Sequence, residues 1–503
     1  MGIGYHDMLK AVTALAAGAA TELSFAPFGY FPLGIIGPAI LFYLWLDAPP
    51  RSAFLIGLCF GTGLFGLGVS WVYVSIQVYG GMPAPLAALS VLLFILLLSF
   101  FPAIVGLVQA RTRTGDVVKA TLLIPALWTL VEWIRGWVLT GFPWLSLGYG
   151  QIDSALSGIA PWSGVYGVSW ASAICSGLLV AIVRAGGRGR KSQIACGGVV
   201  LWAAIWFAGQ VSWVSPAGNP LKIALVQGNV PLEAKWRPEE KGSLVRMYLD
   251  VSAKYTDRDL IVWPEAALPV YLDQLPRTFW EELSRHPADF VTGILERKRK
   301  GQSEKSFNSV LVAASGDSRM YRKQHLVPFG EYVPLSFIFD WIIAYLNIPM
   351  SDFTAWEEEQ DPIDIAGARV AITICYEDAF SGEVRRSLGD ATVLINVSED
   401  SWFGDSFAPH QRLDMAKMRA LENGRPMLRA GNTGISAVID HTGRVTARTA
   451  QFVKTVLLAE VQPMQGTTPF VRFGAWPTIG LCLILVLIFS RGQSWCKNVM
   501  QKR

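Results

Sequence analysis

The sequence predicts two structural parts: a multi-pass α-helical membrane domain and a soluble α/β domain. Of the 503 residues, 52% are hydrophobic and only 16% are charged, whereas soluble domains carry about 25% charged residues. The composition changes abruptly at VSPAGNPLK (214–222), where Pro, Gly and Asn are typical of a linker. We therefore expect a membrane domain at 1–217, a soluble domain at 218–470, and a last helix with a tail at 471–503.

Apolar runs separated by short loops predict the membrane domain. A helix that crosses the hydrocarbon core of a bilayer, roughly 30 Å thick, needs about 20 mostly apolar residues. Such segments lie at 9–23, 31–46, 53–78, 86–108, 117–138, 165–183 and 194–214, and another follows the soluble part at 473–489. The sequence therefore predicts about eight spans, of which the first and the last are short.

Positive charges in the loops predict the orientation of these spans. With the N-terminus inside, the inner loops and the C-terminal tail hold Arg51, Arg111, Arg113, Lys119, Arg184, Arg188, Arg190, Lys191, Arg491, Lys497, Lys502 and Arg503. The outer loops hold essentially Arg135 alone. Because cytoplasmic loops carry an excess of Lys and Arg, both termini should be cytoplasmic and the soluble domain extracytoplasmic.

The charge and the spacing of metal-binding residue types exclude two kinds of partner. The net charge of +4 at pH 7 is small for this length, and no basic low-complexity tract accompanies it. We therefore expect no nucleic-acid partner. Metal binding is also not expected, because His and Cys do not occur in the closely spaced pairs that zinc sites use.

Short β-rich runs alternate with helical stretches in the soluble domain. The runs at 221–230, 259–269, 289–297, 306–315, 368–378, 391–400 and 434–440 are typical of strands, and 239–254 and 413–424 of helices. Nearly continuous apolar strands indicate sheets that are buried on both faces. The pattern therefore predicts a layered α/β domain.

Cys375 lies in ITICYEDAF (372–380), where an apolar strand ends. The other cysteines fall in predicted spans or in the tail: Cys59, Cys175, Cys196, Cys482 and Cys496. Cys375 therefore has no partner in an oxidising compartment, where structural cysteines normally form pairs. It could be a buried, inert core residue, or it could be a nucleophile.

Other reactive residue types also follow the predicted strands. Glu265 comes directly after Trp263-Pro264, and the loop RKQHLVPFGEYVP (322–334) carries Lys323 and Glu331. A carboxylate base, an ammonium group and a thiol suffice for nucleophilic acyl transfer, because a base must form the reactive thiolate and a cation can stabilise it. His325 in the same loop is an alternative base, as in Cys/His sites.

The order of these motifs resembles a known family. Glu in WPEAALP, Lys in YRKQHLVPFGEYVP and Cys in ICYEDAF are similar to the Glu-Lys-Cys triad of the nitrilase, or carbon–nitrogen hydrolase, superfamily. With its flanking spans, the chain resembles the bacterial apolipoprotein N-acyltransferase family nearly from end to end. The resemblance includes GFPWLSLGYGQ (141–151) and SWFGDSFAPHQRLDMAKMRALENGRPMLRAGNTG (401–434).

The resemblance implies a nitrilase-like αββα sandwich and a role for each matching residue. It makes Glu265 the general base, Lys323 the charge-stabilising residue and Cys375 the nucleophile. Glu331, Tyr376 and Glu377 would support these residues, and Trp236 and Trp402 would bind substrate. One position departs from the pattern: Glu399 stands in NVSEDSWFG where the family leads us to expect Asn.

The reaction implied by the resemblance joins two lipid substrates. The sn-1 acyl chain of a phospholipid would pass through a thioester on Cys375 to the α-amino group of the S-diacylglyceryl cysteine of an apolipoprotein. No cofactor or metal is required, and we expect a monomer in the bacterial inner membrane with a periplasmic catalytic domain. The segment 337–350 would be a lipid-facing arm or a buried helix. Glu132 and Arg135 would form a structural pair or contact a headgroup.

Two other functions are compatible with parts of the sequence. A membrane-tethered amidase of the nitrilase type could use the same triad on a small C–N bond, although the apolar spans do not suit a small polar substrate. A transporter with a degenerate soluble domain is the other alternative. Few ionisable residues interrupt the spans, which argues against a polar translocation path.

Overall fold

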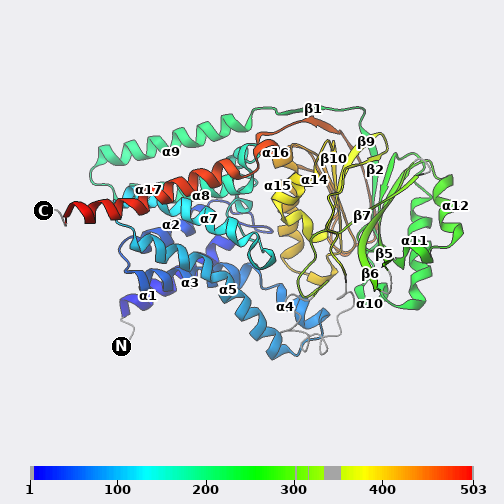
Figure 1. Cartoon of the computed structure of the whole chain (residues 1–503), viewed down its shortest axis with the longest axis horizontal. Coiled ribbons are helices and arrows are strands. Elements are labelled where there is room, and N and C mark those ends of the chain that lie inside the picture. Colours follow the sequence, from blue (N-terminus) through cyan, green and yellow to red (C-terminus); the bar gives the residue numbers. More distant parts are fainter. Residues whose placement is uncertain (1–4, 301–302, 315–316, 333–352, 501–503) are drawn as a thin grey trace. The chain divides into compact units, whose positions relative to one another are not determined.

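The computed structural model describes residues 5–300, 303–314, 317–332 and 353–500 (Figure 1). The chain forms two compact units. The first contains residues 1–73, 84–212 and 469–503, and the second contains 74–83 and 213–468. The segment 337–350, for which the sequence suggested an arm or a buried helix, lies outside the described residues.

The first unit is helical. Its helices are α1 (Tyr5–Glu22), α2 (Leu33–Leu46), α3 (Pro50–Gly68), α5 (Ala84–Arg111), α6 (Asp116–Val118), η2 (Lys119–Leu123), α7 (Ile124–Arg135), η3 (Val138–Thr140), η4 (Tyr149–Gln151), η5 (Ala155–Ile159), α8 (Ala160–Arg184), α9 (Arg188–Gly209), α16 (Pro469–Phe473) and α17 (Trp476–Met500). Within the described residues, five helical stretches are long and apolar enough to cross a membrane: Pro50–Gly68, Ala84–Arg111, Asp116–Arg135, Ala155–Arg184 and Arg188–Gly209. Shorter apolar helices lie at Leu33–Leu46 and Trp476–Ser490.

The helices of this unit pack through small residues and turn leucines outward. Any side chain at Gly63 of α3 would collide with the backbone carbonyl of Leu15 in α1, so the two helices approach closely there. On α5, the side chains of Leu86, Leu89, Leu93 and Leu97 are 45% to 58% exposed. An outer surface of exposed leucines suits a lipid environment rather than water.

Glu132 and Arg135 of α7 both hold the loop that contains GFPWLSLGYGQ. Glu132 accepts hydrogen bonds from the Trp128 indole at 2.8 Å and from the Leu147 amide at 2.9 Å. Arg135 donates to the carbonyl oxygens of Phe142 and Trp144. These bonds tie both residues to the loop and agree with the structural alternative for the pair.

The third predicted span, 53–78, is longer than the α-helix found there. Helix α3 ends at Gly68, and the Ser70 hydroxyl donates to the Leu67 carbonyl at 2.8 Å just after it. The chain continues through α4 (Val72–Val74) and η1 (Ser75–Tyr79). Residues 74–83 belong to the second unit, so the predicted span extends past the boundary between the two units.

The second unit contains two large sheets. The seven-stranded sheet has the order β14-β2-β3-β5-β6-β7 with β4 paired to β5, and the six-stranded sheet has the order β13-β12-β11-β10-β9-β8. Their strands are β2 (Leu221–Gln227), β3 (Leu260–Val262), β4 (Leu268–Tyr271), β5 (Asp289–Lys300), β6 (Ser303–Ala314), β7 (Asp317–Arg322), β8 (Ile363–Ile365), β9 (Ala368–Ile374), β10 (Val393–Ser398), β11 (Met427–Gly431), β12 (Ala437–Ile439), β13 (Val445–Arg448) and β14 (Thr455–Val461). Strands β2, β3 and β5 are mutually parallel, as are β9, β10 and β11.

The two sheets pack face to face, and helices cover their outer faces (Figure 1). Between the sheets lies a core that includes Ile223 and Val291 of one sheet and Ile372 and Val397 of the other. The helices are α10 (Leu232–Lys235), η6 (Pro238–Glu240), α11 (Lys241–Ser252), η7 (Leu272–Gln274), α12 (Arg277–Arg285), η8 (Cys375–Ala379), α14 (Ser381–Ser387), η9 (Ser401–Phe403) and α15 (Ala408–Asn423). Helices α11 and α12 cover the seven-stranded sheet, and α14 and α15 cover the other. The arrangement is an αββα sandwich.

A short ribbon marks where the chain enters and leaves this unit. Strands β1 (Val214–Pro216) and β15 (Met464–Gly466) pair in antiparallel fashion, with Val214 opposite Gly466. The segment 194–214 predicted as a span therefore ends in a strand, because its last residue pairs with β15. Helix α9 ends at Gly209.

Candidate active site

Glu265, Lys323 and Cys375 follow three different strands, and the fold brings them together. Glu265 comes shortly after β3, Lys323 directly after β7, and Cys375 directly after β9. The Lys323 ammonium lies 3.3 Å from Glu265 Oε1, and Glu265 also has a side-chain hydrogen bond with Cys375. All three side chains are buried. A base, a cation and a thiol therefore share one water-poor site inside the sandwich.

Glu331 and Asn308 hold the lysine and the glutamate in place. Lys323 Nζ lies 2.9 Å from a carboxylate oxygen of Glu331, whose other oxygen accepts from the Val327 amide at 2.8 Å. Asn308 Nδ2 donates to both carboxylates, at 2.8 Å to Glu265 and 2.9 Å to Glu331. Sequence reasoning did not single out Asn308. Asn308 stands among Ser306 and Ser309 in β6, so nothing in its local pattern marked it.

The backbone at Cys375 makes a sharp turn that exposes the sulfur to the other groups. Its φ is 51°, in the left-handed region that non-glycine residues rarely adopt. Strand β9 ends at Ile374 and the 3-10 turn η8 begins at Cys375. The Asn396 amide donates to the Cys375 carbonyl at 3.2 Å and supports the turn. Such stored strain is common where a reactive side chain must be presented.

Burial and charge set the protonation of the three groups in opposite directions. Burial raises the pKa of the Cys375 thiol to about 12, against the favourable field of Arg412. For Glu265, burial also raises the pKa, but Lys323 and Asn308 outweigh it and hold the pKa below its usual value. Burial lowers the pKa of Lys323, yet Glu265 and Glu331 more than reverse this and keep it protonated. The resting site therefore holds a thiol, a carboxylate and an ammonium.

Glu377 connects the cysteine turn to the lysine loop. Its carboxylate accepts hydrogen bonds from the Ile374 amide at 2.6 Å, the Gln324 amide at 2.7 Å and the Tyr321 hydroxyl at 3.0 Å. Burial raises the pKa of Glu377 to about 7, and the amide bonds oppose that rise. Glu377 thus ties the residue before Cys375 to the residue after Lys323, which is a positioning role.

Tyr376 and His325 lie in a separate aromatic cluster. The imidazole of His325 stacks on Phe380 with ring centroids 3.7 Å apart, and its Nδ1 lies 2.9 Å from Glu383 Oε1. The Tyr376 ring meets both His325 and Phe380 edge-on. The His325 ring is therefore held by Phe380, Tyr376 and Glu383. The carboxylate that contacts Cys375 belongs to Glu265.

Glu399, the position that departs from the family pattern, forms a buried ion pair with Lys235. Its carboxylate also accepts from Asn432 Nδ2 at 3.0 Å and from the Ser401 amide at 3.2 Å. The Glu399 amide donates to Glu265 Oε2 at 2.8 Å. The negative charge is therefore compensated locally, and the backbone of the same residue holds the glutamate of the site.

The ion pair between Glu399 and Lys235 predicts how single and double substitutions change the free energy of unfolding. Glu399→Gln or Lys235→Met should each lower the free energy of unfolding by roughly 3–5 kcal/mol, because each leaves one buried charge uncompensated. The double variant, which removes both charges, should cost less than the sum of the two single changes. Thermal unfolding of the full chain in detergent measures this. Strictly additive losses would contradict the coupling.

Trp236 and Trp402 both lie next to residues that contact Glu399. Trp236 follows Lys235 at the end of α10, and Trp402 follows Ser401 in η9; both indoles are half-buried. The Ser75 hydroxyl donates to the Trp402 carbonyl at 2.8 Å, and the Tyr79 ring meets the Trp402 ring edge-on at 6.1 Å. The segment 74–83 thus supports the turn that carries Trp402.

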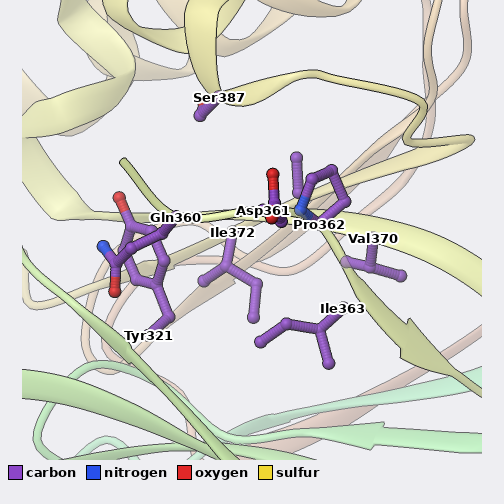
Figure 2. A pocket seen from close by; sticks show the side chains of 9 residues that line it. Tyr321, Gln360, Asp361, Pro362, Ile363, Val370, Ile372 and Ser387 are labelled. Atoms are coloured by element: carbon purple, nitrogen blue, oxygen red, sulfur yellow. The ribbon is translucent and has the colours of Figure 1, made fainter. Parts of the chain in front are cut away.

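A small crevice elsewhere in the sandwich does not coincide with this site. It is lined by Tyr321, Gln360, Asp361, Pro362, Ile363, Val370, Ala371, Ile372 and Ser387. Figure 2 shows that the side chains of Ile363 and Ile372 reach into it from neighbouring strands, beside Tyr321. None of Glu265, Lys323 and Cys375 lines it, so it is a packing defect beside β9 rather than the reaction site. In the part of the chain that the structure describes, no group of three or more His, Cys, Asp and Glu side chains could hold a metal ion.

Comparison with known proteins identifies the family. Residues 17–178 match the apolipoprotein N-acyltransferase N-terminal domain, and residues 222–468 match the carbon-nitrogen hydrolase family. A Methylococcus capsulatus protein named apolipoprotein N-acyltransferase is 42% identical over 96% of this chain and 96% of its own length. The chain belongs to the apolipoprotein N-acyltransferase family. A family member from Azotobacter vinelandii is 41% identical over 94% of this chain and 93% of its own length.

The match of 222–468 confirms the nitrilase-like α/β domain that the family motifs predicted. A Saccharomyces cerevisiae protein of the nitrilase superfamily aligns with 50% of this chain and 93% of its own, at 18% identity and a TM-score of 0.38. Membership of the family therefore rests on the full-length relatives.

Proposed function

We propose that this chain transfers the sn-1 acyl chain of a phospholipid to the α-amino group of the S-diacylglyceryl cysteine at the N-terminus of apolipoproteins. One observation carries the proposal: Glu265, Lys323 and Cys375 meet in a chain that is 42% identical to an apolipoprotein N-acyltransferase over 96% of its length. The apolar helices of the first unit support it, because both substrates are anchored in a membrane.

In the first half-reaction, the Cys375 thiol gives its proton to Glu265 while the sulfur attacks the ester carbonyl. Because the pKa of the buried thiol is about 12, proton transfer is coupled to attack rather than completed beforehand. The carbonyl oxygen becomes an oxyanion, which the Lys323 ammonium stabilises. When the intermediate collapses, the C–O bond breaks and Glu265 returns its proton to the departing lysophospholipid oxygen. Cys375 is left as a thioester.

In the second half-reaction, the acceptor amine attacks the thioester carbonyl. The pKa of an α-amino group is near 8, so a fraction is neutral and nucleophilic at pH 7. Glu265 takes a proton from the attacking nitrogen, and the C–S bond then breaks. The electron pair returns to sulfur, and Glu265 gives the proton back to restore the thiol. Glu265 thus acts as base and acid in turn.

The mass of the protein after incubation with phospholipid alone tests the proposal. We expect an increase by one acyl group, located on the peptide that contains Cys375, and its removal when a diacylglyceryl lipopeptide with a free N-terminus is added. Cys375→Ala is the matched control and should acquire no acyl group. An unmodified wild-type protein under these conditions would contradict the thioester route.

We further propose that about eight helices span the bacterial inner membrane, with both termini cytoplasmic and a periplasmic catalytic domain on a monomer. The asymmetry of Lys and Arg in the loops supports this orientation. A cysteine at the exposed position Lys305, in a chain whose other cysteines except Cys496 are replaced, should react with an impermeant thiol reagent from the periplasmic side. Cys496 should react only after the membrane is opened. The reverse labelling would contradict the orientation.

A further inference from the structure

A cluster of ionised side chains lies beside Cys375, opposite the groups described above. Arg412 of α15, Arg429 of β11, Asp378 and Asp400 are all buried, with 0% or 1% exposed area for each side chain. Two guanidinium groups face two carboxylates, so the cluster is neutral as a whole. Such a cluster can have a purely structural role. The contacts that its members make with Cys375 decide whether it also affects the thiol.

Arg412 contacts the sulfur of Cys375, which Arg429 does not. Its Nη1 lies 3.4 Å from Cys375 Sγ and 2.5 Å from Asp400 Oδ1. Its Nη2 donates to both oxygens of Asp378, at 3.2 and 3.3 Å, and to Ser398 Oγ at 3.0 Å. The guanidinium is therefore held from two sides with one N–H directed at the sulfur.

Arg429 binds the same two carboxylates without reaching the sulfur. Its Nη1 donates to Asp378 Oδ2 at 2.9 Å and to Asn396 Oδ1 at 3.1 Å, and its Nη2 donates to Asp400 at 2.9 and 3.2 Å. Arg429 is thus equally buried and equally paired. The chain itself supplies a matched reference for what the ion cluster contributes apart from the sulfur.

The charges on the Lys323 side of Cys375 leave a thiolate without a net positive neighbour, so a second cation is needed. Lys323 carries one positive charge but contacts two carboxylates, Glu265 and Glu331, so that side is not positive overall. Once Glu265 has taken the proton of Cys375 it is neutral, but Lys323 and Glu331 still cancel each other, so the thiolate faces no net positive charge on that side. Arg412 is in hydrogen-bonding reach of the sulfur and remains charged at any working pH.

We propose that Arg412 is a further catalytic residue, which stabilises the Cys375 thiolate through the Nη1–H to Sγ hydrogen bond. The inference rests on the proposed function. In the first half-reaction the bond stabilises the negative charge that grows on sulfur as Glu265 removes the proton. In the second it stabilises the sulfur as the electron pair of the breaking C–S bond returns to it. Arg412 gives up no proton in either step.

The order in which charged groups affect the thiol agrees with this assignment. Burial is the largest influence and raises the pKa of Cys375 to about 12; Arg412 is the next and lowers it, ahead of Lys323. Without Arg412, the thiolate would be still less accessible, because Glu265 and Asp400 both oppose it.

The rate of alkylation of Cys375 by iodoacetamide, measured against pH on the full chain in detergent, tests the proposal. The other cysteines are replaced in all variants. Because only the thiolate reacts, Arg412→Gln should raise the apparent pKa of Cys375 by about one unit or more and slow alkylation about tenfold at any pH below it. Arg412→Lys, which keeps a charge but has a different shape, should shift the profile less. Arg429→Gln, the matched control, should shift the profile clearly less than Arg412→Gln, because Arg429 does not reach the sulfur and acts on it only through Asp378 and Asp400.

Each outcome either supports or overturns the role of Arg412. An equal shift in Arg412→Gln and Arg429→Gln would show that the cluster acts only through the fold, and no shift in a folded Arg412→Gln would overturn the proposal. If Arg412→Gln does not fold, Arg412→Lys and Arg429→Lys decide, because both keep the charge and only the first alters the group at the sulfur: a larger shift in Arg412→Lys supports the proposal, and equal profiles overturn it. Alkylation needs no lipid substrate. Failure of wild-type protein to form an acyl adduct would therefore refute the proposed function without altering this result.

Discussion

Replacing Cys375 with alanine should abolish both acyl transfer and formation of the acyl-enzyme, while the protein remains folded. The small thiol carries the covalent step, and alanine fills nearly the same space among its buried neighbours. Activity is measured as N-acylated lipopeptide formed from phospholipid and a diacylglyceryl lipopeptide. Thermal unfolding of the variant checks that the fold is unchanged. Residual turnover close to that of the wild type would mean that Cys375 is not the nucleophile.

The partners of Cys375 should follow in a defined order. Glu265→Gln should lower turnover by about 10²–10⁴-fold, since it removes the proton acceptor. Lys323→Met should cost about 10²–10³-fold, as expected when one oxyanion donor is lost. His325→Ala is the control and should cost far less, because its ring is engaged with Glu383 and Phe380. Loss of turnover in His325→Ala with a mild effect in Glu265→Gln would instead indicate a Cys/His mechanism.

Mixing the enzyme with phospholipid alone should release close to one lysophospholipid per active site and then stop. Two bulky lipid substrates must reach one buried thiol, so the thioester should form before the acceptor enters, which gives ping-pong kinetics. The surroundings of Cys375 exclude water, because Glu265, Lys323 and Glu331 are all buried around it. The thioester should therefore persist until an amine arrives.

Adding a diacylglyceryl lipopeptide with a free N-terminus should restart lysophospholipid release and yield the N-acylated product. An N-acetylated lipopeptide is the matched control and should not restart it, because its amide nitrogen is not nucleophilic. Continuous release of lysophospholipid and fatty acid without acceptor would mean that the enzyme is a hydrolase. Release of ammonia from small amides would favour the amidase alternative.

The sequence alone was sufficient to locate the principal residues of the candidate site. Glu265 and Cys375 each follow an apolar strand, β3 and β9, whereas Lys323 follows β7, whose residues are mostly polar. Because β3 and β9 belong to different sheets, the strand pattern alone did not predict that these residues meet, and the order of the family motifs did. Helices also occur where long apolar runs were found, because composition over about 20 residues needs no knowledge of contacts.

The sequence did not reveal residues that act through contacts with parts of the chain far away in sequence. Asn308 lies in a strand, Arg412 in a helix, and Lys235 at the end of a short helix, and each has an ordinary local pattern. Their partners are Glu265, Cys375 and Glu399, which are 30 or more positions away in the chain. Periodicity and propensity act over a few residues and carry no information about such pairs.

The sequence by itself determined the division into an apolar helical part and an α/β part, the strand ends that carry Glu265 and Cys375, and the family. Hydrophobic burial depends mainly on how apolar a local stretch of sequence is, so these features could be recognised directly in the sequence. Only the tertiary structure decided that α3 ends at Gly68, that Lys235 compensates Glu399, and that Arg412 reaches the sulfur. A buried charge needs a partner close to it in the folded chain. Which residue becomes that partner depends on how the fold packs, and the order of the residues in the sequence does not reveal it.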